Sequence, residues 1–127
     1  MPRPEHLALI QGVITRMAGN SFLIKGWTVT LVAGLSALAA DKSDGAFGWL
    51  AVAVALVFAF LDAFYLALER AYRRLYADVA AERNTDPWTL NAGKVGPGDV
   101  LQGLTGFAVW PLHGAALAGA LIVAFSA

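Results

Sequence analysis

Three side chains that can carry or share a charge stand inside long apolar stretches of this sequence: Lys25, Asp62 and His113. An ionised carboxylate is costly in lipid, so we expect Asp62 to face protein or water and to be paired. Lys25 and His113 are its expected partners, because they lie at a similar depth. Such a carboxylate has three possible roles: an Asp–Lys bridge that locks two helices together, a group that lines or gates a pore, and a proton relay that includes His113.

His113 follows Trp110 and Pro111 in the sequence. A proline inside a transmembrane helix releases a backbone carbonyl one turn earlier and usually kinks the helix. A kink beside the histidine would be either the hinge of a gate or a packing accommodation. In the second case, which is the more frequent one, the imidazole bonds to a neighbouring helix.

A second group of candidate residues is basic and aromatic. It comprises Arg70, Tyr72, Arg73, Arg74, Tyr76, Arg83, Trp88 and Lys94. Guanidinium groups beside aromatic rings can hold phosphates and stack the bases of a single strand. The alternative is that these arginines only mark the cytoplasmic side of a membrane. Acidic residues among them also neutralise much of their charge.

Other kinds of chemistry find no support in the sequence. It contains no cysteine, which excludes a disulfide framework, a thiolate metal site and a cysteine nucleophile. It also lacks a glycine-rich phosphate loop, a metal-ligand spacing and a Ser/His/Asp arrangement. We therefore expect no enzymatic activity, no metal and no cofactor.

The elements that must position the candidate residues are membrane helices. Hydrophobic residues make up 58% of the 127 positions and charged residues 14%, whereas a soluble domain carries about a quarter charged residues. Residues 22–40, 46–68 and 104–126 are apolar and close to the roughly 20 residues that cross a bilayer. Because a backbone in lipid must satisfy its own hydrogen bonds, we expect an all-α membrane protein with three transmembrane helices.

An amphipathic helix is expected ahead of the first span, over residues 4–19. Its apolar residues recur at helical spacing, which predicts a helix on the membrane surface or packed on another helix. Gly19-Asn20-Ser21 is expected to break or bend the chain before the span, and a continuous helix is the alternative.

The second span is expected to continue as a helix into the cytoplasm, to about residue 83. Residues 84–87 (Asn-Thr-Asp-Pro) would end it, and a cytoplasmic loop is expected over residues 84–98. Asp99 is the expected N-cap of the following helix.

The lysines and arginines predict the orientation in the membrane. Three lie at or before the first span and five between the second and third, whereas the link at 41–45 has one lysine and two aspartates. The positive-inside rule then places the N-terminus and the long loop in the cytoplasm, for a multi-pass protein of a bacterial inner membrane. Trp27, Trp49 and Trp88 lie near or beyond predicted span ends, as interfacial anchors do.

Small residues form ridges on the first and third spans, at Gly26, Thr30 and Gly34, at Gly114 and Ala118, and at Ala115 and Gly119. Ridges of this kind let helix backbones approach closely, although Gly and Ala are also common in membrane helices in general. Three helices cannot enclose an aqueous pathway by themselves. A conducting form must therefore be a homo-oligomer, most simply a cyclic one.

Two segments are similar to a known family. Residues 5–26 (EHLALIQGVITRMAGNSFLIKG) and 61–76 (LDAFYLALERAYRRLY) resemble the membrane effector of Hailong antiviral defence systems, a small bacterial membrane protein encoded beside a nucleotidyltransferase. The resemblance implies a tetrameric ion channel that depolarises an infected cell and arrests its growth, which is abortive infection. It also implies control by a single-stranded oligonucleotide that the partner nucleotidyltransferase makes.

Carried onto this chain, the resemblance points to the helix that leaves the membrane. With the basic residues of the following loop, the candidate oligonucleotide site comprises Arg70, Arg73, Arg74, Tyr76, Arg83 and Lys94. The candidate pore or gating residues are Lys25, Asp62 and His113. Two other functions remain open. One is a non-conducting scaffold that anchors a cytoplasmic partner, and the other is a small proton-coupled transporter.

Overall fold

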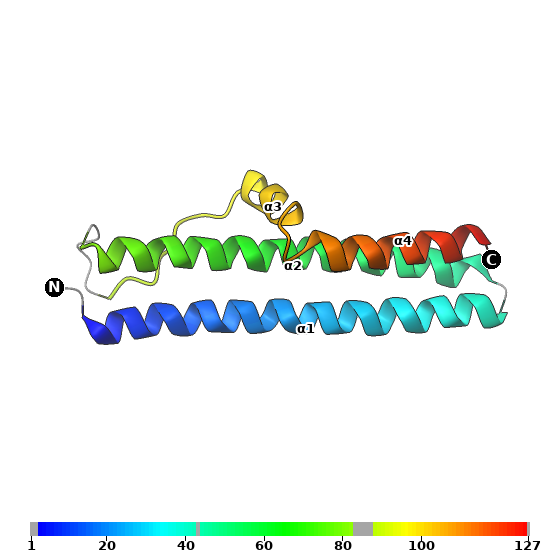
Figure 1. The fold of residues 1–127 in the computed structure, drawn as a ribbon, viewed down its shortest axis with the longest axis horizontal. Coiled ribbons are helices and arrows are strands. Elements are labelled where there is room, and N and C mark those ends of the chain that lie inside the picture. The colour runs from blue at the N-terminus through cyan, green and yellow to red at the C-terminus, as the bar shows by residue number, and fades with distance from the viewer. Residues whose placement is uncertain (1–2, 43, 83–87, 127) are drawn as a thin grey trace.

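The computed structural model describes residues 3–42, 44–82 and 88–126, and this part of the chain is helical and contains no strand. Its helices are α1 (Pro4–Lys42), α2 (Gly45–Ala80), α3 (Pro97–Leu104) and α4 (Trp110–Ser126). The first two form a long antiparallel hairpin (Figure 1). α4 lies along the half of the hairpin that is nearer to its turn, and α3 projects from the side (Figure 1).

Two of these helices, α1 and α2, are long and apolar enough to cross a membrane. With 39 and 36 residues, they measure about 58 and 54 Å, well beyond the roughly 30 Å of a hydrocarbon core. Only part of each helix can therefore lie in lipid. Apart from Leu9, the large apolar side chains that these two helices expose fall within residues 22–38 and 49–64.

This distribution divides the bundle into two parts. We call residues 21–42, 45–64 and 110–126 the membrane half, because its outer surface is apolar. We call residues 4–20 and 65–80 the stalk, in which α1 and α2 pack on each other without α4 (Figure 1). A core of Ile10, Ile14, Leu75 and Val79 holds the stalk together.

The break expected at residues 19–21 is wrong, because α1 passes through Gly19-Asn20-Ser21 as one helix. The amphipathic segment over residues 4–19 is therefore the first part of α1. It packs on α2 through Ile10 and Ile14, which is the second of the two placements considered for it. α2 likewise runs past residue 68 and ends at Ala80, whereas the expected stop signal at 84–87 lies outside the described residues.

The third apolar stretch does not form a single helix over residues 104–126. α3 ends at Leu104, turns occupy residues 105–109, and α4 begins at Trp110. With its 17 residues, α4 is about 25 Å long, shorter than a typical hydrocarbon core. The structure thus has two helices of spanning length and a shorter third one, and a third span stays a prediction.

Two local predictions in this region are also corrected. The N-cap of α3 is Gly96 and not Asp99; Asp99 lies three residues later, and its Oδ2 accepts a hydrogen bond of 2.9 Å from the Gly96 N–H. Pro111 lies in the first turn of α4. A proline there loses no helical hydrogen bond, so it is compatible with the start of the helix and does not kink it.

Close helix contacts within the chain use other glycines than the predicted ridges. A Cβ on Gly48 would stand 2.7 Å from the Cα of Ala124, and one on Gly103 would stand 2.7 Å from the carbonyl oxygen of Ala63. These two glycines let α4 and α3 approach α2. A Cβ added to any glycine of the predicted ridges would meet no atom within 4 Å. These glycines are Gly26, Gly34, Gly114 and Gly119.

Candidate functional site

The strongest candidate site is built around Asp62, which is completely buried. Its Oδ2 lies 2.6 Å from Lys25 Nζ, and it accepts a hydrogen bond of 2.8 Å from His113 Nε2. The Ser21 hydroxyl donates to the other oxygen, Oδ1. We call these four residues the Asp62 cluster. The structure thus brings together the three predicted residues Lys25, Asp62 and His113, one from each helix of the membrane half.

Ser21 is the member of the cluster that sequence reasoning missed. It lies one helical turn before Lys25, so both side chains stand on the same face of α1. Lys25 Nζ donates a hydrogen bond of 2.7 Å to the Ser21 hydroxyl. The four-residue spacing was the available signal. It was hidden because Gly19-Asn20-Ser21 was interpreted as a break in the helix.

The charges of the cluster balance. The carboxylate of Asp62 is matched by the Lys25 ammonium, and His113 must carry a proton on Nε2 to donate to Asp62. Its Nδ1 is buried and has no hydrogen-bond partner among the described residues. A second proton there would leave a buried N–H without an acceptor, at a cost of about 1–3 kcal/mol. His113 thus bonds the carboxylate through one ring nitrogen and leaves the other without a partner among the described residues.

The cluster lies at the boundary between the membrane half and the stalk. Asp62 is about 25 Å along α2 from its first residue, Gly45, which is most of a hydrocarbon core. Trp27 and Trp110 lie within a turn of Lys25 and His113, and both are exposed. At the opposite end of the bundle, the rings of Trp49 and Phe125 meet edge to face at 5.0 Å. Aromatic residues at both ends are typical of membrane interfaces.

The geometry matches a helix-locking bridge better than an open pore. Asp62 has no exposed surface in a single chain, and contact with further chains can only bury it more. In this conformation Asp62 cannot line an aqueous path. A pore-lining role would require α1 or α4 to move away from it.

Hydrolytic chemistry is not supported by the cluster. A serine nucleophile needs a base that removes its proton, but the Ser21 hydroxyl donates to a carboxylate and Lys25 is held by the same carboxylate. Among the described residues, no group of three or more His, Asp or Glu side chains could hold a metal ion.

The described candidate oligonucleotide residues make different contacts in a single chain. Arg73 pairs with Glu69 at 2.7 Å and lines a small pocket with Tyr76. Arg70 reaches the turn between α3 and α4, where its Nη2 is 3.0 Å from the position of a Cβ on Gly106. Arg74 and Lys94 are exposed on the stalk and the loop, and Arg83 lies outside the described residues.

A second polar contact, which the sequence did not reveal, fastens the loop after α2 to the start of α1. Buried His6 bonds through Nε2 to the carbonyl oxygen of Thr89 at 2.7 Å. The guanidinium carbon of Arg3 lies 5.0 Å from the centre of the Trp88 ring. These contacts hold the loop against the end of the stalk.

Comparisons with protein-family models, curated proteins and solved structures find no match for this chain. The likeness to Hailong effectors therefore stays a resemblance of two segments.

Proposed function

We propose that the protein is a subunit of an oligomeric ion channel in a bacterial inner membrane, and that the Asp62 cluster holds its helices in the non-conducting arrangement. One observation carries the proposal: a fully buried carboxylate in the membrane half bonds to donors from both other helices. Charged side chains within membrane helices are rare and costly. Where they occur, they usually belong to ion pathways or to the devices that gate them.

We propose that the cluster has two states, a paired one that holds the helices together and an open one in which they separate. While Lys25 and His113 contact Asp62, the charge is compensated and α1 and α4 are held against α2. Loss of either contact leaves a buried charge or polar group without its partner, which is unfavourable unless water enters. Opening would therefore separate the helices and hydrate the carboxylate in one step.

Oligomer formation is supported by the outward direction of the small-residue ridges. Gly26 and Gly34 on α1 and Gly119 on α4 have open space beside them in a single chain. Other copies of the chain can approach closely at such positions. We propose a cyclic homo-oligomer, a tetramer as in the family that the chain resembles, with the ion path between subunits.

Control by a single-stranded oligonucleotide is part of the same proposal. The stalk carries exposed Arg73 and Arg74 on the same helix as Asp62. Arg74 is about 18 Å along α2 from the carboxylate, and a ring of subunits would repeat these arginines around one axis. Depolarisation, growth arrest and the partner nucleotidyltransferase follow from the resemblance alone.

Conductance of the purified protein in planar bilayers tests the proposal. We expect Asp62→Asn, which removes the charge that holds Lys25, to raise the open probability and to change ion selectivity. Asp41→Asn is the matched control, because Asp41 is exposed at the far end of α1; it should conduct as the parent does. Short single-stranded oligonucleotides should shift the open probability of the parent.

Two results would overturn this function. Bilayers that stay silent for every variant, with and without oligonucleotide, would favour the non-conducting scaffold. Equal open probability and selectivity in the parent and Asp62→Asn would remove the cluster from gating.

A second function, proton-coupled transport, is favoured by the bond between His113 and Asp62. It links two groups that can exchange a proton, and His113 Nδ1 is left without a partner in the described chain. A proton flux into vesicles under a pH gradient, abolished by His113→Gln, would support it. In the channel that we propose, His113→Gln would instead raise the open probability, because it weakens the contact that holds α4 to Asp62.

A further inference from the structure

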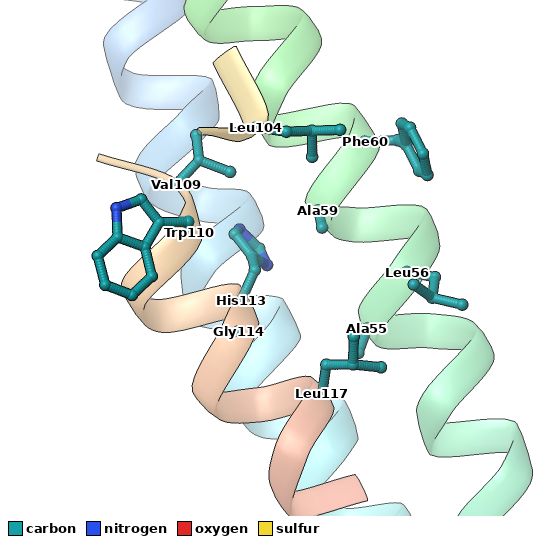
Figure 2. Close-up of a pocket in the computed structure, with 10 residues that line it drawn as sticks. All are labelled: Ala55, Leu56, Ala59, Phe60, Leu104, Val109, Trp110, His113, Gly114 and Leu117. Carbon is teal, nitrogen blue, oxygen red and sulfur yellow. The ribbon is translucent and has the colours of Figure 1, made fainter. Parts of the chain in front are cut away.

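The membrane half also contains an apolar cavity of about 220 Å³ on its side, between α2, α4 and the turn before α4 (Figure 2). Small residues create it. Ala55 and Ala59 on α2 and Gly114 on α4 line it, and a Cβ on Gly114 would meet nothing within 4 Å. Larger residues at these positions would close the space between the two helices.

The cavity opens on the outer surface of the membrane half and not on the interior of the bundle. Leu56, Phe60 and Trp110 belong to its wall and are exposed on the outer surface of the membrane half. Apart from one edge of His113, the side chains that line it are apolar. Apolar cavities do not hold water, whereas they do bind apolar molecules. The occupant must therefore be apolar and must be present within the membrane.

We propose that this cavity binds one acyl chain of a bilayer lipid. Its volume of about 220 Å³ is somewhat larger than the roughly 150 Å³ of an apolar cavity that holds one benzene molecule. That is room for a segment of one chain and not for a whole lipid. The proposal requires that α2 and α4 lie in lipid, and it does not require that the protein conducts ions.

Binding at this place would act on the Asp62 cluster through His113. The imidazole lines the cavity (Figure 2) and also donates to Asp62. An acyl chain in the cavity would keep the imidazole ring in contact with the carboxylate and would hold α4 in place. An empty cavity would leave the ring free to turn away. Lipid occupancy would therefore stabilise the paired state of the cluster.

Native mass spectrometry of the full chain, reconstituted with phosphatidylcholine and extracted into mild detergent, tests the site. We expect the parent to retain one phospholipid per chain. Gly114→Leu fills the cavity from α4 and should lower this occupancy by about tenfold. Gly12→Leu is the control: Gly12 has the same open space beside it on α1, lies outside the ridges and does not line the cavity, so the lipid should be retained. Ala59→Leu fills the same cavity from α2 and replaces Gly114→Leu if that variant does not fold.

Fluorescence gives an independent measurement. In a variant whose only tryptophan is Trp110, phosphatidylcholine with brominated chains should quench the emission, and Gly114→Leu should reduce the quenching.

Equal lipid retention and equal quenching in the filled and control variants would overturn the proposal. Loss of the oligomer without loss of lipid in Gly114→Leu would also overturn it, because a second copy would then occupy the cavity. The mass and fluorescence measurements are independent of conductance, so failure here and failure of the channel proposal are distinguishable.

Discussion

Asp62 on α2 and His113 on α4 share a hydrogen bond of 2.8 Å. In the part of the chain that the structure describes, no other side-chain hydrogen bond joins α4 to the hairpin of α1 and α2. Lys25 on α1 meets the same carboxylate oxygen at 2.6 Å. One oxygen atom thus connects the three helices of the membrane half, while apolar contacts at Ala120 and Ala124 hold α4 farther along.

Removal of the carboxylate should be more damaging than replacement of the whole ion pair. Asp62→Ala leaves the Lys25 ammonium without its partner, and we expect it to cost about 3–5 kcal/mol of stability. The double variant Asp62→Leu with Lys25→Met buries no unpaired charge and should recover most of this loss. Unfolding in mixed detergent micelles measures both. A single variant as stable as the double one would show that the pair is not closely coupled.

Adding one methyl group at Gly48 should displace α4. A Cβ there would stand 2.7 Å from the Cα of Ala124, so Gly48→Ala should cost about 1–3 kcal/mol through overpacking. Gly12→Ala is the control, because its Cβ enters open space and Gly12 lies outside the ridges; it should gain up to about 1 kcal/mol from helix propensity. Thermal unfolding in detergent compares them. Equal melting temperatures would contradict the close contact between α2 and α4.

The stalk should loosen independently of the membrane half. Leu75 belongs to the stalk core, and Leu75→Ala should cost about 2–5 kcal/mol. Amide hydrogen exchange should quicken over residues 4–20 and 65–80 and stay slow over 45–60. Leu9→Ala, at an exposed position of the same stalk, should change stability by less than about 0.5 kcal/mol. Faster exchange throughout the chain after Leu75→Ala would show a single cooperative unit.

Cysteine labelling should decide whether α4 spans the membrane. The sequence has no cysteine, so in each single-cysteine variant an impermeant maleimide can label only the introduced thiol. Asp44→Cys and Lys94→Cys should react from opposite sides of the membrane. Ser126→Cys should react from the side of Asp44, because the end of α4 lies beside the hairpin turn (Figure 1). Reaction from the side of Lys94 would mean that only α1 and α2 cross.

The centre of the candidate site could be predicted from the sequence for a simple physical reason. A charged residue in an apolar stretch needs a partner, and few partners exist, which is why Lys25, Asp62 and His113 were identified together. Ser21 was missed because local propensity at Gly19-Asn20-Ser21 favours a break. Packing on α2 and the bond to Asp62 outweigh that preference.

The third apolar stretch was harder to interpret, because hydropathy does not distinguish a helix from an apolar turn. The boundary depends on tertiary contacts that a sequence pattern does not contain, such as the approach of Gly103 to the Ala63 carbonyl. The ridges show a similar limit. Spacing predicted that Gly26 and Gly34 share a face of the helix, but it could not give the direction in which that face points.

The unbroken course of α1 and α2 has a mechanical consequence. A continuous helix transmits torque along its axis, so a roll of α1 imposed at the tip of the stalk must also turn its segment beside the carboxylate. Ser21 and Lys25 stand on one face of α1 and would swing away from Asp62 together. Rotation of α1 about its own axis would then break the contacts of the Asp62 cluster, and neither α1 nor α2 would need a hinge.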